Sequence, residues 1–193
     1  MTEDIKNRKG AQKAVDIPAE VLSLLNAGNI ETVNLTEWLA VDHSQLVASV
    51  FPALGMDKNI IEEVVSQINQ QKKPSTMNTI RLIGALLYEK YVHTDFYEPL
   101  FRQLSTHLSD SVRCYACYLV ALHTEIPLED KLHKLKPLVA DSHFGVREII
   151  WMALRPEMSE HLDFSIAFLS HWAESEEENI RRFSTEALRP RGV

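Results

Sequence analysis

Arginines recur at helical spacing within the last fifty or so residues of the chain. Arg147, Trp151 and Arg155 follow one another four residues apart, so on a helix they share one face. Arginine donates paired N–H groups to phosphate oxygens, and an indole offers a stacking surface for exposed bases. Residues of these types at this spacing favour contact with the phosphate backbone and bases of a nucleic acid.

A second, similar set follows one helix later. Arg181, Thr185 and Arg189 repeat the same spacing, and Arg191 comes directly after them. Two successive helices would therefore present arginine stripes, which a curved array commonly turns toward its inner surface. The candidate DNA-binding residues are Arg147, Trp151, Arg155, Arg181, Arg189 and Arg191.

A purely structural interpretation stands beside the functional one. Helical hairpins of the HEAT type often hold an arginine at the start of the second helix, paired with an aspartate about six residues earlier. Asp141 and Arg147 have this spacing. Trp151 is equally explained as a core residue or as a ring stacked under an arginine. Arg155, Arg189 and Arg191 have no such structural explanation, although solvated arginines are common on protein surfaces.

Other patterns that could carry chemistry point to no cofactor. Cys114 and Cys117 form a CxxC on an expected helix, but no second pair of ligands accompanies them, so small buried residues explain both. The eight histidines are scattered, and the chain contains no glycine-rich phosphate loop and no GxSxG. We expect no metal and no other cofactor.

The elements that position the arginines repeat along the chain. Val112-Arg113, Val146-Arg147 and Ile180-Arg181 recur every 34 residues, and Leu154-Arg155-Pro156 returns as Leu188-Arg189-Pro190. A period of this length is typical of stacked helical hairpins, which share a continuous core because one hairpin cannot bury its apolar face alone. Val146, Ile149 and Ile150 would form the packing face of their helix.

The rest of the chain also reads as helices with short connections. The expected helices span 17–26, 34–40, 42–54, 57–68, 74–91, 95–107, 110–123, 127–140, 143–154, 163–173 and 177–188. Gly28 and Gly55 are expected to end helices. The expected N-caps are Asp42, Asp57, Asp110 and Asp163. Pro156 is expected to break the helix that precedes it. We therefore predict an all-α fold, a HEAT-like α-α superhelix of stacked antiparallel helical hairpins.

Residues 1–13 are expected to form a flexible, charged tail, and residues 14–193 a single HEAT-like repeat domain with clear repeats over about 108–193. No apolar run is long enough for a membrane helix, and the charged N-terminus does not resemble a secretory signal. With only two cysteines, the sequence favours a reducing, cytoplasmic compartment.

The charge is unevenly distributed along the chain. The net charge is −7, and residues 14–70 alone contribute −7, from one basic and eight acidic residues. Nucleic-acid binders usually have a basic excess, so the total argues mildly against DNA. Because one acidic block accounts for the deficit, a local basic stripe can still exist elsewhere.

The C-terminal repeats resemble a known family. His143-Phe-Gly-Val-Arg-Glu-Ile-Ile-Trp-Met-Ala-Leu-Arg-Pro156 and Asn179-Ile-Arg-Arg-Phe-Ser-Thr-Glu-Ala-Leu-Arg-Pro-Arg-Gly192 look like segments of the bacterial DNA alkylation repair proteins of the AlkC/AlkD type. Near the N-terminus, Ile17-Pro-Ala-Glu-Val-Leu22 and Glu31-Thr-Val-Asn-Leu-Thr-Glu-Trp-Leu-Ala40 resemble one branch of that superfamily. The likeness covers most of the chain from about residue 8 and is most specific in the last fifty residues.

The resemblance implies a HEAT-like array that grips alkylated duplex DNA. Active members of the family excise N-alkylated purines such as 3-methyladenine and 7-methylguanine, using aromatic residues and a carboxylate close to the deoxyribose. A nearby anion stabilises the oxocarbenium character that develops when the N-glycosidic bond is hydrolysed. DNA binding in alkylation repair, with glycosylase activity as an extension, is the function that the resemblance implies.

Two departures from the family leave the activity open. The chain stops just after Arg191, whereas relatives continue for at least another helical hairpin, so part of the expected groove would be missing. Glu148 and Glu186 lie on the relevant helices, but each is also explained by pairing with a neighbouring side chain, and no catalytic residue is assigned. The alternatives are a protein-interaction scaffold and a catalytically inactive relative of the family. We expect no interaction with a membrane. The sequence does not determine the oligomeric state.

Overall fold

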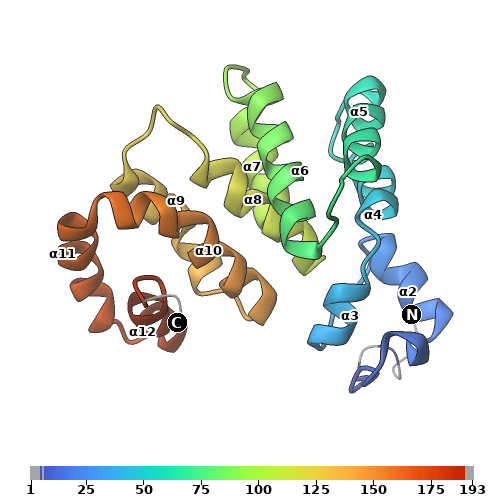
Figure 1. The fold of residues 1–193 in the computed structure, drawn as a ribbon, viewed down its shortest axis with the longest axis horizontal. Helices are drawn as coiled ribbons and strands as arrows, with labels where there is room; N and C mark the ends of the chain where they lie inside the picture. Colours follow the sequence, from blue (N-terminus) through green and yellow to red (C-terminus); the bar gives the residue numbers. More distant parts are fainter. Residues whose placement is uncertain (1–4, 6, 190–193) are drawn as a thin grey trace.

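A computed structural model describes residue 5 and residues 7–189, and every element within these residues is a helix (Figure 1). The short η1 is followed by eleven α-helices in chain order: η1 (Ala14–Asp16), α2 (Ala19–Asn26), α3 (Leu35–Ala40), α4 (His43–Val50), α5 (Lys58–Asn69), α6 (Thr76–Tyr91), α7 (Tyr97–Ser105), α8 (Asp110–Ala121), α9 (Leu128–Val139), α10 (Phe144–Glu160), α11 (Leu162–Ala173) and α12 (Glu178–Glu186). The predicted all-α class is confirmed.

Consecutive helices pack as pairs, and the pairs pack side by side. Helices α7 and α8, α9 and α10, and α11 and α12 contact one another within each pair. The second helices form a further series, since α6 contacts α8, α8 contacts α10, and α10 contacts α12 (Figure 1). This arrangement is compatible with the expected superhelix of stacked hairpins.

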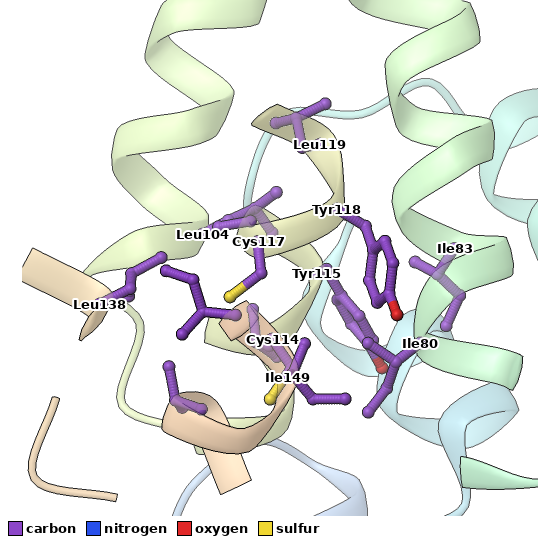
Figure 2. Close-up of a cluster of buried hydrophobic side chains, with 14 of the residues drawn as sticks. Ile80, Ile83, Leu104, Cys114, Tyr115, Cys117, Tyr118, Leu119, Leu138 and Ile149 are labelled. Carbon is purple, nitrogen blue, oxygen red and sulfur yellow. The ribbon is translucent and has the colours of Figure 1, made fainter. Parts of the chain in front are cut away.

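Helix α8 lies at the centre of the hydrophobic core. All of its residues from Asp110 to Ala121 are buried, and Figure 2 shows its side chains between those of the neighbouring helices. Cys114 and Cys117 are fully buried free thiols whose pKa values are raised by that burial. The two cysteines therefore serve as small core residues, as the sequence indicated.

A glycine allows α6 to approach α8 closely. A Cβ atom added to Gly84 would lie 2.4 Å from Cβ of Tyr118 and 3.2 Å from the carbonyl oxygen of Tyr115. Both neighbours belong to α8, and neither contact can be relieved by a flexible side-chain end. The helix therefore carries glycine at a position where any side chain would separate the two elements.

Several predicted helix ends are confirmed, and others differ. Asp42 caps α4 by accepting from the backbone N–H groups of Ser44 and Gln45, and Gly28 follows α2 with a φ of 72°. Gly55 has a φ of 83°, but α4 already ends at Val50, so the predicted end of that helix at Gly55 is wrong. Asp57 occupies the N-cap position of α5 without a side-chain hydrogen bond. Asp110 and Asp163 lie inside the first turns of their helices rather than at the caps.

The prediction that Pro156 breaks its helix is wrong. Helix α10 continues through Pro156 to Glu160, although an internal proline removes one backbone hydrogen bond. The turn beyond it is held by tertiary contacts: Met158 is fully buried, and Glu157 accepts from Nζ of Lys131 at 2.5 Å. These contacts outweigh the local preference of the proline.

Part of the expected tail packs against the helices, while Asn7, Lys9, Gln12 and Lys13 are exposed. Ile5 is buried, and Arg8 donates from Nε and Nη2 to the carboxylate of Glu37 at 2.9 and 2.8 Å. The Asn34 side chain also donates to the carbonyl oxygen of Ala11 at 2.9 Å. Composition suggested a charged tail, whereas the buried Glu37 gives Arg8 a partner that holds this segment against the helices.

Candidate nucleic-acid interface

Three arginines at the 34-residue period make the same local contact. Each lies near the start of the second helix of a hairpin and donates from Nη1 to two main-chain carbonyls of the loop before that helix. The contacts are Arg113 to His107 and Leu108 at 2.8 and 3.0 Å, Arg147 to Asp141 and Ser142 at 2.6 and 2.7 Å, and Arg181 to Ser175 and Glu176 at 2.6 and 2.8 Å. The recurrence of arginine therefore has a structural cause: it ties each loop to its helix.

The first of these arginines also has carboxylate partners. Arg113 donates from Nε to Asp141 at 2.8 Å and from Nη2 to Glu31 at 2.5 Å, and its side chain is only 10% exposed. The Asp141 carboxylate therefore pairs with Arg113 of the preceding hairpin. The sequence predicted a pair with Arg147, but Arg147 donates only to the main-chain carbonyl of Asp141 and not to its carboxylate. The geometry explains this difference, because Asp141 also caps the backbone N–H of His143 at 2.7 Å.

The other two arginines lack this neutralisation. Asp141 follows Arg113 by 28 residues, and the residue 28 positions after Arg147 is Ser175, which carries no charge. Among the described residues, no carboxylate oxygen lies within ion-pair distance of Arg147 or Arg181. Nε of Arg147 is also buried without a hydrogen-bond partner in this part of the chain. Both guanidinium groups are thus oriented by neutral carbonyls and keep their charge.

A small pocket between α10 and α12 collects several of the predicted residues. Its lining is Val139, Arg147, Glu148, Trp151, Asn179, Arg182, Phe183 and Glu186. Trp151 donates from Nε1 to Glu148 at 3.0 Å, and the guanidinium carbon of Arg155 lies 4.1 Å from the centre of the indole. The stripe of Arg147, Trp151 and Arg155 therefore shares one face of α10, as its spacing predicted.

Arg155 has a structural contact that the sequence did not indicate. It donates from Nε to the Ala187 carbonyl at 3.0 Å and from Nη2 to the Glu186 carbonyl at 2.6 Å. These bonds attach α10 to the C-terminal end of α12, where the last carbonyls of a helix lack intrahelical partners. Arg155 therefore supports the pocket and stacks on its indole.

The two carboxylates considered for catalysis both have cationic neighbours. Glu148 accepts from Arg182 at 3.2 Å, and Glu186 lies 3.6 Å from Arg189, whose side chain is 71% exposed. Arg182 was missed by the sequence interpretation, although it follows Glu148 by one 34-residue period. Residues one period apart face each other in a stack, so opposite charges at this spacing were a usable signal. Arg191 lies outside the described residues.

The described residues contain no group of three or more His, Cys, Asp or Glu side chains that could hold a metal ion. None of the described helices is long and apolar enough to cross a membrane. Comparison with known proteins finds no matching family model, no matching curated protein and no matching solved structure.

Proposed function

We propose that the face formed by α10 and α12 binds the phosphate backbone of duplex DNA, and that the protein acts on alkylated DNA. The observation that carries this proposal is the state of Arg147 and Arg181. Each guanidinium is held by uncharged main-chain carbonyls and has no carboxylate partner among the described residues. The equivalent Arg113, two helices away, is neutralised by Asp141 and Glu31.

Carbonyl anchoring prepares an arginine for an anion. It fixes the direction of the side chain through Nη1 and leaves Nη2 as a donor for phosphate oxygens. The axes of packed helices lie about 8–10 Å apart. Phosphates of one DNA strand recur every ~3.4 Å along the duplex axis, so this distance corresponds to two to three nucleotides. Arg147 on α10 and Arg181 on α12 therefore suit successive contacts to one strand, with the exposed Arg189 beside them.

The alkylated-base part of the proposal rests on the family resemblance together with Trp151. Purines alkylated at N7 or N3 carry positive charge, and such planar cations are attracted by aromatic faces and carboxylates. Trp151 is hydrogen-bonded to Glu148 and already stacks with the planar cation of Arg155. The same pair of groups suits an N-alkylated purine, and Glu148 is the carboxylate best placed to act beside it.

Fluorescence anisotropy with a labelled duplex tests the phosphate contacts. Arg181→Gln combined with Arg189→Gln removes two cationic groups of this face, and Lys73→Gln combined with Arg102→Gln removes the same charge from exposed positions elsewhere. We expect the first pair to weaken binding by about tenfold or more and the second to change it little, because charge-assisted hydrogen bonds to phosphate contribute ~1.5–3 kcal/mol each. Equal effects of both pairs, or no binding by the unaltered protein, contradict the proposal.

Incubation with methylated duplex separates recognition from chemistry. Release of free methylpurine by the unaltered protein, abolished by Glu148→Gln, is the outcome expected of a glycosylase that uses this carboxylate. Tighter binding of methylated than of unmodified duplex without release is the outcome for an inactive relative. A protein that neither releases methylpurine nor prefers methylated duplex has no role in alkylated DNA at this site.

A further inference from the structure

A second surface lies away from the arginine pocket, where α9, the loop before it and α11 meet. A groove of about 550 Å³ occurs there. Its lining is Thr124, Glu125, Ile126, Pro127, Leu128, Glu129, Glu157, His161 and Phe164. The groove is lined by residues of α9 and α11, by the connection before α9 and by Glu157 near the end of α10, whereas the arginine pocket is formed mainly by α10 and α12.

Apolar side chains line part of the groove. Ile126, Pro127 and Phe164 lie in the groove itself. Phe164 of α11 is 38% exposed and lines the groove. Leu162 and Ile166 are also exposed, but they lie two residues before and after Phe164 and therefore on another face of the helix. An apolar lining with a few polar groups is typical of a binding groove.

The charges around the groove select the kind of partner. Glu125 and Glu129 are exposed residues of its lining, and Nε2 of His133 lies 3.9 Å from the Glu129 carboxylate. The lysines of this region are already engaged, since Lys131 pairs with Glu157 and Lys134 with Glu98. Among the acidic residues that line the groove, Glu157 is paired, while Glu125 and Glu129 have no lysine or arginine partner among the described residues.

An adjoining cavity extends the same charge pattern. It measures about 540 Å³, shares Ile126 with the groove, and brings in Asp95 and Asp130, for which the described residues offer no salt-bridge partner. A polyanion would be repelled here, while a basic chain with an apolar anchor would satisfy both features. The two cavities together have the extent of a peptide rather than of a small molecule.

We infer that this groove binds a basic peptide segment of a partner protein. An aliphatic or aromatic side chain of the segment would enter the groove beside Ile126 and Phe164, and its lysines or arginines would lie over Glu125, Glu129 and Asp130. Apolar anchors in a groove give such complexes their affinity, and the charged rim gives orientation and selectivity. This inference is independent of DNA binding, because no residue of the arginine pocket takes part.

Anisotropy with a labelled synthetic peptide of lysines and leucines at helical spacing tests the inference. The groove variant combines Glu125→Lys with Glu129→Lys, and the matched control combines Asp16→Lys with Glu20→Lys, two exposed carboxylates on other elements. We expect the groove variant to bind about tenfold more weakly or worse, and the control to bind like the unaltered protein. Phe164→Ala, which removes the apolar contact without changing charge, is expected to weaken binding severalfold.

Several outcomes would overturn the inference. These are an absence of peptide binding by the unaltered protein, equal losses in the groove and control variants, unchanged binding by Phe164→Ala, and equal binding of a peptide with glutamates in place of the lysines. Circular dichroism of each variant verifies that the helices are intact, and DNA binding unchanged in the groove variant separates this surface from the arginine pocket.

Discussion

At the scale of single residues, the arginine at the same repeat position has a structural role in one repeat and a proposed ligand-binding role in another. Arg113 is nearly buried and holds Asp141 and Glu31, whereas Arg181 is exposed and bonded only to carbonyls of its own loop. Removal of Arg113 would leave the Asp141 carboxylate, which is only 9% exposed, without its ion-pair partner, whereas Glu31 is 40% exposed and would stay solvated. An exposed guanidinium bonded to carbonyls is less needed for folding and remains available to a ligand.

Arg113→Gln is therefore expected to lower the free energy of unfolding by about 3 kcal/mol. Arg181→Gln, at the equivalent exposed position, is expected to lower it by about 1 kcal/mol or less. Urea denaturation of both variants measures the difference. Equal losses would show that the two arginines have the same role and would remove the basis for treating Arg181 as a ligand-binding residue.

The buried His43 predicts a dependence of stability on pH. Burial lowers its pKa from 6.5 to about 4, against a smaller opposite effect of Asp42, and its Nδ1 lies 2.6 Å from the Tyr115 hydroxyl. Between these two pKa values the unfolded chain binds a proton that the native protein excludes. Stability from this group is therefore complete above about pH 6.5 and is lost as the pH falls toward 4, by on the order of 3 kcal/mol.

Unfolding free energies at pH 7, 6 and 5 check this prediction, with His43→Gln as the comparison because glutamine keeps a polar partner for Tyr115. We expect the unaltered protein to lose more stability than the variant across this range. Parallel pH profiles for the two proteins would mean that another group causes the dependence.

The residue scale also shows where sequence reasoning stops. The shared face of Arg147, Trp151 and Arg155 follows from helical spacing alone, and the burial of Cys114 and Cys117 from their small apolar type. The bonds from Arg155 to the carbonyls at the end of α12 do not, because they depend on how two helices are rotated against each other. Periodicity predicts which residues share a face of a helix, but it does not predict which atoms of the neighbouring helix those residues contact.

At the scale of elements, the contact between α6 and α8 depends on the absence of a side chain. Gly84→Ala would place a Cβ 2.4 Å from Tyr118 and is expected to destabilise the protein by about 1–3 kcal/mol, since closely packed cores do not accept added atoms. Glu89→Ala, on the exposed side of the same helix, is expected to change stability by less than ~0.5 kcal/mol. Thermal unfolding distinguishes them, and a stabilised Gly84→Ala protein would disprove the close approach.

Helix ends show the balance between local and tertiary preferences. Gly28 and Asp42 act where local chemistry places them, because a left-handed turn or a cap is decided within a few residues. Pro156 does not end α10, because the turn beyond it is held by tertiary contacts: Lys131 of α9 pairs with Glu157, and Met158 is buried in the core. Local signals therefore predict boundaries well only where no distant partner competes.

At the scale of the whole molecule, the N-terminal segment closes onto the repeats. Asp110 accepts from the N–H and hydroxyl of Thr32 at 2.9 and 3.0 Å, and His143 lies 2.9 Å from the Thr32 carbonyl. Burial raises the pKa of Asp110 despite its neighbours. These bonds join residues 78 and 111 positions apart, so no local pattern predicts them.

The distribution of charge over the molecule separates two surfaces. In the pocket between α10 and α12, Arg147 is held by main-chain carbonyls and Arg182 pairs with Glu148. In the groove beside α9 and α11, Glu125 and Glu129 have no lysine or arginine partner among the described residues. With a net charge of −7, long-range attraction to DNA is weak, so binding must depend on the contacts themselves. Phosphate contacts then determine the response of DNA binding to salt.

The salt dependence of duplex binding is the most direct measurement of that claim. Each phosphate contact contributes about 0.9 to the slope of log affinity against log salt, so Arg181→Gln with Arg189→Gln should reduce the slope by about two. The charge-matched pair Lys73→Gln with Arg102→Gln should leave the slope unchanged. An unaltered slope in the first pair, or the same reduction in both, would contradict a phosphate-binding role for the face formed by α10 and α12.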